Sequence, residues 1–95
     1  MPNPLVSVII VNYNGRKYLQ PCFDSLFSGI YRDIEIIFVD NGSGDGSLEF
    51  VTKNYPQIKV INNRANLGLA IASNRGAACA RGEYLFFLNN DTIAD

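Results

Sequence analysis

The stretch LVSVIIVNYNG, residues 5–15, decides the fold that this chain is expected to adopt. Its first part, Leu5–Val11, is an almost unbroken apolar run, and the turn-forming cluster Asn12-Tyr13-Asn14-Gly15 follows at once. Short runs rich in Val and Ile are typical of strands buried on both faces, as in a parallel sheet. The same pattern recurs further along the chain, with apolar runs at Ile34–Val39, Ile58–Ile61 and Tyr84–Leu88.

The segments between these runs have the length and spacing of crossover helices. In Arg16–Ser28 the apolar residues Leu19, Phe23, Leu26 and Phe27 recur at helical spacing. Ser47–Asn54 and the alanine-rich Leu69–Ala80 are the other expected helices. The order β-α-β-α-β-α-β predicts an α/β fold with a doubly wound parallel sheet, in strand order 3-2-1-4. Ligands of such sheets bind beyond the carboxyl ends of the strands, here between the first and fourth strands.

The composition of the chain argues against several classes of partner and location. The chain has 95 residues, a net charge of −1 and no histidine. The charge argues against a broad basic face, so we expect no nucleic-acid partner. Cys22 and Cys79 are expected to be small buried residues in a reducing compartment. No secretory leader and no membrane-spanning run is visible, so a cytoplasmic protein is expected.

Polar clusters follow all four expected strands. Because the carboxyl ends of parallel strands meet at one edge of the sheet, these clusters are expected to form a single ligand-binding rim. Asn, Asp and Gly are also the ordinary residues of turns, so each cluster alone is weak evidence. The four clusters are Asn12–Gly15, Asp40–Gly46, Asn62–Asn66 and Asn89–Asp91.

The common nucleotide and metal motifs are missing. Gly42–Ser47 nearly fits the dinucleotide fingerprint, but Ser47 occupies the third glycine position and the loop follows the second strand. There is no Gly-x4-Gly-Lys-Ser/Thr phosphate loop, and the two cysteines do not have zinc-site spacing. A nicotinamide or flavin site is therefore disfavoured.

Four stretches in series nevertheless resemble a known family. VSVIIVNYNG, IEIIFVDNGSGDGS, NLGLAIASNRGAACARGEY and LFFLNNDT are similar, in order and spacing, to the N-terminal half of a family 2 glycosyltransferase of the Rossmann-like GT-A fold. The last two stretches look most like the rhamnosyltransferase-type branch. The resemblance implies one nucleotide-sugar-binding domain over residues 1–95 that lacks the C-terminal, acceptor-binding half.

The resemblance also implies roles for particular residues in binding a UDP- or dTDP-linked sugar. Tyr13, with Asn12 beside it, matches the tyrosine that lies against the nucleotide base. Asp40 and Asn41 match a pair of acids that reach the base, although Asn41 replaces the second acid. An amide oxygen can still accept a hydrogen bond from a pyrimidine ring N–H. Gly68 matches a place where the backbone passes close to the nucleotide.

Two further motifs carry over with substitutions. Asn74 and Gly76 match an R-N-x-G pattern in which Ser73 replaces the arginine. Asn89-Asn90-Asp91 matches the D-x-D motif, with Asn89 replacing the first acid. Asp91 is then the residue expected to hold Mg²⁺ or Mn²⁺, and Asn90 is expected near the ribose.

The resemblance implies an inverting sugar transfer to a saccharide or lipid-linked acceptor, with a base supplied by the later half of the protein. We therefore expect no catalytic residue here and no activity from these residues alone. Two alternatives stay open, namely a non-catalytic nucleotide-binding module completed by a partner chain and an unrelated small α/β domain of the receiver type. The apolar fourth strand is expected at the sheet edge, where it would promote a homodimer or larger assembly. The full-length protein would lie in the cytoplasm or at the cytoplasmic face of the membrane.

Overall fold

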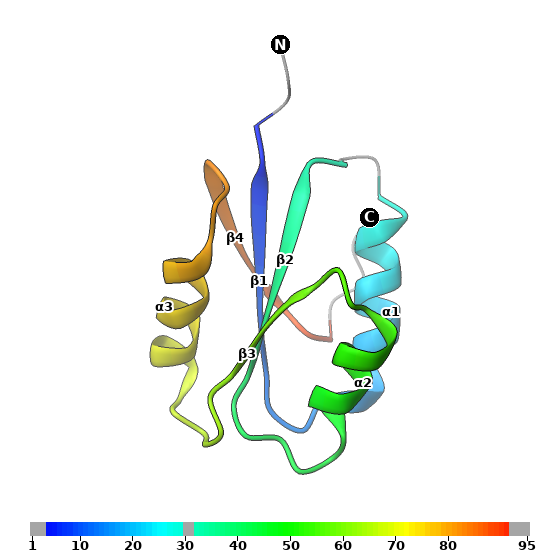
Figure 1. The fold of residues 1–95 in the computed structure, drawn as a ribbon, viewed down its shortest axis with the longest axis vertical. Coiled ribbons are helices and arrows are strands. Elements are labelled where there is room, and N and C mark those ends of the chain that lie inside the picture. Colours follow the sequence, from blue (N-terminus) through cyan, green and yellow to red (C-terminus); the bar gives the residue numbers. More distant parts are fainter. Residues whose placement is uncertain (1–3, 30–31, 92–95) are drawn as a thin grey trace.

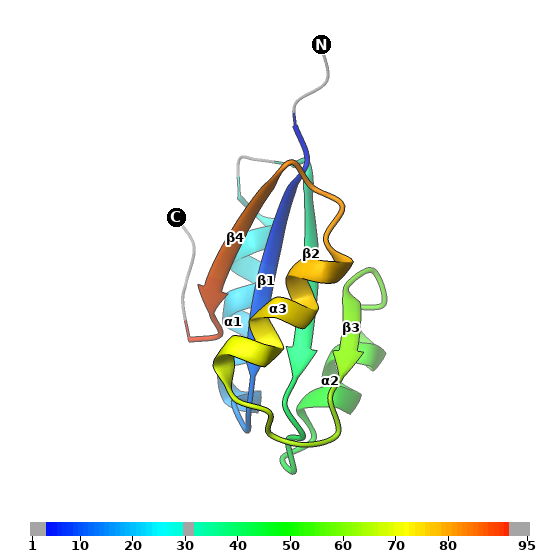
Figure 2. The ribbon, with the colours of Figure 1, turned by 90° about the vertical axis from the view of Figure 1, so that its left-hand side faces the viewer.

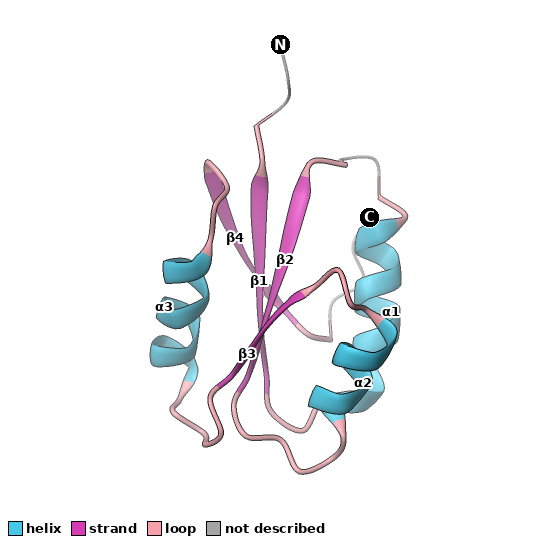
Figure 3. Cartoon of the chain, in the orientation of Figure 1, coloured by secondary structure: helices cyan, strands magenta, loops and turns pink. Residues whose placement is uncertain are grey.

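A computed structural model of the chain describes residues 4–29 and 32–91, and its elements alternate as the sequence predicts (Figures 1 and 3). Every expected strand and helix is present, and each boundary lies within one residue of the expected position. The elements are β1 (Val6–Asn12), α1 (Arg16–Phe27), β2 (Ile34–Asp40), α2 (Ser47–Asn54), β3 (Lys59–Asn62), α3 (Leu69–Cys79) and β4 (Tyr84–Asn89).

The strands form one parallel sheet in the order β3-β2-β1-β4, which confirms the predicted topology. Figure 2 shows α3 in front of the sheet, and Figure 1 shows α1 and α2 together on the opposite face. All strands therefore end at the same edge, where the β1–α1, β2–α2 and β3–α3 loops gather (Figure 1). This is the edge at which the sequence places the ligand-binding rim.

The central strands are buried on both faces, which is why their sequences are nearly continuous apolar runs. On the side of α1 and α2, Val8 and Ile10 pack with Phe23 and Phe38 in the larger core cluster. On the α3 side the core is thinner, and is formed by Ile9, Ile37, Val39 and Ala72.

Gly76 explains how α3 comes so close to the sheet. A Cβ atom at this position would lie 2.6 Å from Cγ2 of Ile9 and 3.1 Å from Cγ2 of Val39. Only a residue without a side chain allows this approach, so the helix lies directly over β1 and β2.

The edge strand β4 differs from the other strands. Its side chains Tyr84, Leu85, Phe86 and Phe87 are between 46% and 60% exposed. The expectation that each apolar run is buried on both faces is thus wrong for β4, which pairs only with β1 among the described residues. The expected position of this strand at the sheet edge is confirmed.

Two smaller expectations are wrong. Cys79 is exposed, because α3 contacts the sheet through Ala72 and Gly76 and ends at Cys79. Phe27 is 44% exposed and stacks on Tyr55 instead of entering the core. Over the ranges 4–29 and 32–91, no helix is long and apolar enough to cross a membrane.

Candidate functional site

The polar ends of three neighbouring strands are joined by side-chain hydrogen bonds. Asn12, at the end of β1, donates from Nδ2 to Oδ1 of Asp40 at the end of β2, over 3.0 Å. Asn90, which follows β4, donates from Nδ2 to Oδ1 of Asn12 over 2.6 Å. Asn12 and Asp40 are each only 1% exposed. Hydrogen bonds therefore hold the side chains at the carboxyl ends of β2, β1 and β4 in one row.

Ser43 organises the loops around this row. Its Oγ donates to Oδ1 of Asp40 over 2.7 Å and accepts from the backbone N–H of Asn14 over 2.8 Å. Its own N–H donates to Oδ2 of Asp40 over 2.9 Å. These bonds fix the β1–α1 loop, which carries Tyr13. The Tyr13 side chain is 53% exposed, so an aromatic ring stands open to solvent on a well-anchored loop.

Asp45 holds the starts of two helices at the same edge. Its carboxylate accepts from the N–H of Arg16, the first residue of α1, and from the N–H of Ser47, the first residue of α2. Partial desolvation raises the pKa of Asp45, but the hydrogen bonds from Ser47 and Arg16 outweigh it and leave the pKa below its ordinary value. The charged form is therefore the one that the fold stabilises.

On the β3 side, Asn41 is buried within the protein. It is 3% exposed, its Nδ2 donates to the carbonyl of Gly68 over 3.3 Å, and its Oδ1 accepts from Nδ2 of Asn63 over 2.8 Å. Gly68 itself precedes α3 with φ of 84° and ψ of 166°, a conformation that is essentially restricted to glycine. Asn41 therefore connects β2 to the beginning of α3.

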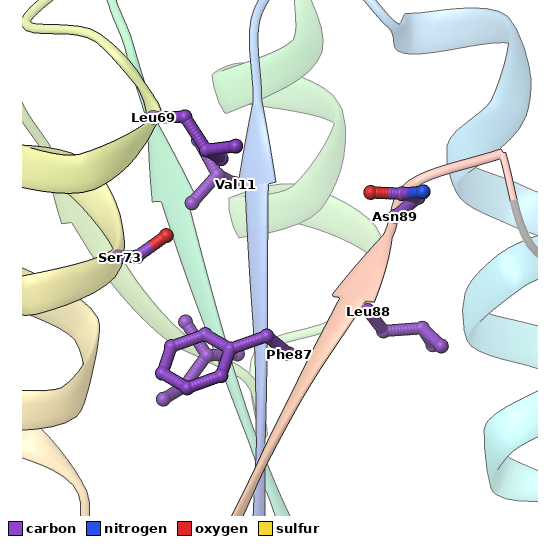
Figure 4. A pocket seen from close by; sticks show the side chains of 7 residues that line it. Val11, Leu69, Ser73, Phe87, Leu88 and Asn89 are labelled. Carbon is purple, nitrogen blue, oxygen red and sulfur yellow. The ribbon is translucent and has the colours of Figure 1, made fainter.

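The end of β4 borders a small cavity between this strand and α3 (Figure 4). Phe87 points toward Ser73 on α3, whereas Leu88 points to the other side of the sheet (Figure 4). The cavity has a volume of about 120 Å³. Pockets for ligands of drug size typically measure ~300–1,000 Å³, so a nucleotide would have to bind along the open rim. Asn89 borders both the cavity and the rim.

Asp91 lies exposed just beyond β4, on the side of α1. Burial, with a smaller contribution from the charge of Asp91, raises the pKa of the Cys22 thiol to about 11. Within the described residues, His, Cys, Asp and Glu side chains form no group of three that could hold a metal ion. One carboxylate with neighbouring amide oxygens nevertheless suits Mg²⁺ or Mn²⁺ when phosphates and waters supply the other ligands. Asp91 alone would supply only one or two of the six ligands that Mg²⁺ takes, so the others would have to come from phosphate oxygens and waters.

The structure gathers most of the residues singled out in the sequence. Asn12, Asp40 and Asn90 form one hydrogen-bonded row, whereas Asn41 and Gly68 form a second group beside it. Asn74 lies exposed on α3. Three residues organise the rim without having been singled out in the sequence: Ser43 and Asn63 were included only as members of the rim clusters, and Arg75 was not noticed. Of these, only Ser43 had a local signal, a serine three residues after the acid that ends a strand.

Comparison with known proteins gives a consistent result. Residues 7–95 match the family described as Glycosyl transferase family 2. An uncharacterized glycosyltransferase EpsJ of Bacillus subtilis is 42% identical over 93% of this chain, and the glycosyltransferase GlyG of Streptococcus pneumoniae is 37% identical over 94%. The chain spans only 26% and 31% of the length of these two relatives. A chondroitin synthase of Pasteurella multocida is 36% identical over 93% of this chain, which covers 9% of that protein.

Solved structures show the same fold. The structure of S. aureus TarS 1-349 in complex with UDP superposes with a TM-score of 0.83 at 29% identity, over 92% of this chain and 27% of that one. A mannosyltransferase, PcManGT of Pyrobaculum calidifontis, determined with GDP-Man and Mn²⁺, gives a TM-score of 0.83 over 95% of this chain and 28% of that one. At 24% identity the second comparison shows the fold alone.

Proposed function

Because the chain belongs to glycosyl transferase family 2, we propose that it is the donor-binding part of an inverting glycosyltransferase that uses a UDP- or dTDP-linked sugar. The observation that carries the proposal is the row of strand-end side chains at one edge of the sheet, from Asp40 through Asn12 to Asn90, with Asp91 beside it. The acceptor would be a saccharide or a lipid-linked saccharide. The finer assignment to a hexosyl or rhamnosyl type is part of the same proposal.

Each group along the rim has a task in this proposal. Tyr13 offers an exposed aromatic face on which a pyrimidine can stack. In this proposal Asn41 contacts the base and the backbone at Gly68 passes close to the nucleotide. Asn74 and Asn89 contribute to donor binding, and Asn90 lies near the ribose. Asp40 accepts three hydrogen bonds from Asn12 and Ser43, and its contribution is to hold this edge in place.

Asp91 is proposed to hold Mg²⁺ or Mn²⁺ together with the diphosphate. When bound, the cation supplies charge neutralisation for the departing nucleoside diphosphate. The residues of this chain then orient the donor so that its anomeric carbon faces the acceptor. In the transfer, the acceptor oxygen bonds to that carbon while the carbon–diphosphate bond breaks, and a base takes the proton of the acceptor hydroxyl. We propose that this base belongs to the acceptor-binding half and not to residues 1–95.

Calorimetric titration tests the donor site. UDP and dTDP are titrated with and without Mn²⁺ into the wild type, Asp91→Ala and the control Asp33→Ala. Asp33 is also an exposed aspartate, but it precedes β2 at the opposite edge of the sheet. Metal-dependent binding that is lost in Asp91→Ala and kept in Asp33→Ala supports the proposal. The absence of any binding to the wild type would refute it.

The exposed edge of β4 favours a second candidate, a nucleotide-binding module completed by another chain. Apolar edge strands pair readily with other chains, and four β4 side chains are about half exposed. We therefore propose a homodimer or larger assembly through β4. Sedimentation at high protein concentration tests this proposal, and a monomer would contradict it.

Activity measurements test the remaining proposals. If adding a C-terminal fragment of a relative restores sugar-transfer activity, the result favours the nucleotide-binding module completed by another chain. Sugar transfer by the 95-residue chain alone would refute its proposed inactivity. The cytoplasmic location stays a prediction.

A further inference from the structure

Arg75, on the second turn of α3, begins a chain of hydrogen bonds that ends at the start of the same helix. Its guanidinium donates from an Nη atom to Oδ1 of Asn63 over 3.0 Å. Asn63 donates from Nδ2 to Oδ1 of Asn41 over 2.8 Å, and Asn41 donates from Nδ2 to the Gly68 carbonyl over 3.3 Å. We call the three side chains Arg75, Asn63 and Asn41 the amide relay.

The chemistry of its two ends gives the relay a direction. A guanidinium has only donors, so the atom of Asn63 that meets Arg75 must be the amide oxygen. The NH₂ group of Asn63 is then turned toward Asn41 and requires an acceptor there. At the other end the Gly68 carbonyl can only accept, which requires the NH₂ group of Asn41. Both ends demand the same orientation of Asn41.

Burial makes that orientation costly to reverse. Asn41 and Asn63 are only 3% and 8% exposed, so water has little access to replace a lost partner. The Gly68 carbonyl also accepts the first helical hydrogen bond of α3, from the N–H of Ala72 over 3.2 Å. If Asn41 turned over, two oxygen acceptors would face each other at Gly68.

We propose that Arg75, acting through Asn63, is a specificity-determining positioning residue for the nucleotide base; this rests on the proposed function. Each amide oxygen has two acceptor sites, and the relay uses one of those on Asn41. Asn41 is 3% exposed, and a base that contacts its amide oxygen through this exposed part meets an acceptor of fixed orientation. Uracil and thymine offer an N–H donor at ring position 3, which matches this acceptor, whereas cytosine offers an unprotonated nitrogen. The relay thus favours UDP or dTDP over CDP.

The decisive substitution is Asn63→Asp. The carboxylate still accepts from Arg75, but it cannot donate to Asn41. Asn41 is then driven to turn its NH₂ group toward the carboxylate, so a donor replaces the acceptor on the side of the base. Arg75→Met removes the anchor of the relay, and Arg75→Lys keeps a donor there. Arg81→Met is the matched control, since Arg81 is an exposed arginine in the loop that follows α3, before β4.

UDP and CDP are titrated with Mn²⁺ into each variant, and thermal unfolding verifies that each is folded. The ratio of UDP to CDP affinity is expected to fall about tenfold or more in Asn63→Asp, which corresponds to a change of about 1.4 kcal/mol in the relative binding free energy. The same ratio is expected to fall in Arg75→Met. It should stay near the wild-type value in Arg75→Lys and Arg81→Met.

The outcomes separate this inference from the function on which it rests. If the wild type binds UDP and the ratio is unchanged in Asn63→Asp and Arg75→Met, the relay does not set base preference and only the inference is overturned. Equal losses of UDP and CDP affinity assign the relay a purely structural role, which also overturns it. If the wild type binds neither nucleotide, the proposed donor site fails, and the inference fails with it.

Discussion

Gly15→Ala should separate the ends of β1 and β4 without disturbing the core. Gly15 precedes α1 with φ of −106°, a backbone conformation open to alanine. A Cβ atom there would overlap Nδ2 of Asn90 and lie 2.6 Å from Oδ1 of Asn12. The end of the Asn90 side chain is flexible and can swing away, but Asn12 is buried and its Oδ1 has to shift as well. The substitution therefore acts by breaking the 2.6 Å hydrogen bond between Asn90 and Asn12.

The size of the effect follows from the burial of Asn12. This residue is 1% exposed, and a buried acceptor that loses its partner costs about 1–3 kcal/mol. Replacing glycine by alanine restricts the unfolded chain and returns about 0.4–1 kcal/mol. The expected net loss in the free energy of unfolding therefore lies between about 0 and 2.6 kcal/mol, with a central value of about 1.3 kcal/mol. Urea denaturation measures it, with Gly44→Ala as the control, because a Cβ atom at Gly44 meets nothing within 4 Å.

A double-mutant cycle with Asn90→Ala tests the reason for the loss. If Gly15→Ala acts mainly through the Asn90–Asn12 hydrogen bond, it should cost clearly less once Asn90 is alanine, and the cost that remains is that of displacing Asn12. An equal cost in both backgrounds would refute the reasoning and would place the effect in the backbone of the β1–α1 loop. UDP affinity should fall in Gly15→Ala and not in Gly44→Ala, because only the first substitution moves a side chain of the proposed donor site.

Three further predictions concern packing, charge and thiol chemistry. Gly76→Val should destabilise the fold by about 1–3 kcal/mol in urea denaturation, because its side chain would force α3 away from Ile9; a loss below about 0.5 kcal/mol would contradict the close contact. Asp45→Asn should be less stable than the wild type above pH 3.8, the ordinary pKa of the carboxyl, and the difference should vanish as the pH falls through the lowered pKa of the folded state. Unfolding curves that stay equally separated at every pH would contradict this linkage. A thiol reagent at neutral pH should modify Cys79 quickly and Cys22 only on unfolding, because Cys22 is buried with its pKa raised to about 11; equal rates would contradict the assigned burial.

The sequence predicted the fold well because the fold depends on local patterns. A strand covered on both faces must be apolar along its length, so β1 and β2 could be recognised without any knowledge of their neighbours. The boundaries shift by one residue for a physical reason. Asn12 and Asp40 are polar, yet they pair in register at the ends of β1 and β2, and the strands extend to include them.

What the sequence did not reveal depends on contacts between distant segments. Helical spacing placed Phe27 on the inner face of α1, but the ring stacks on Tyr55, with 6.0 Å between ring centroids. Asn63 was visible only as one of several turn residues, and Arg75 as an ordinary helix residue. Their function in the rim depends on Asn41 being within reach, 22 residues from Asn63 along the chain. No local pattern encodes such a contact.

The abundance of amides at the rim has an electrostatic consequence. A nucleoside diphosphate is strongly anionic, so every uncompensated carboxylate near it opposes binding. The buried Asp40 accepts three hydrogen bonds, and amides occupy positions 41 and 89, where the resemblance leads one to expect acids. Asp91 is left as the exposed carboxylate beside the crevice, and a cation bound there would reverse the local charge. We therefore expect Mn²⁺ alone to bind weakly, and its affinity to rise when UDP supplies the phosphate oxygens. Equal Mn²⁺ affinity with and without UDP would show that the protein alone supplies the ligands.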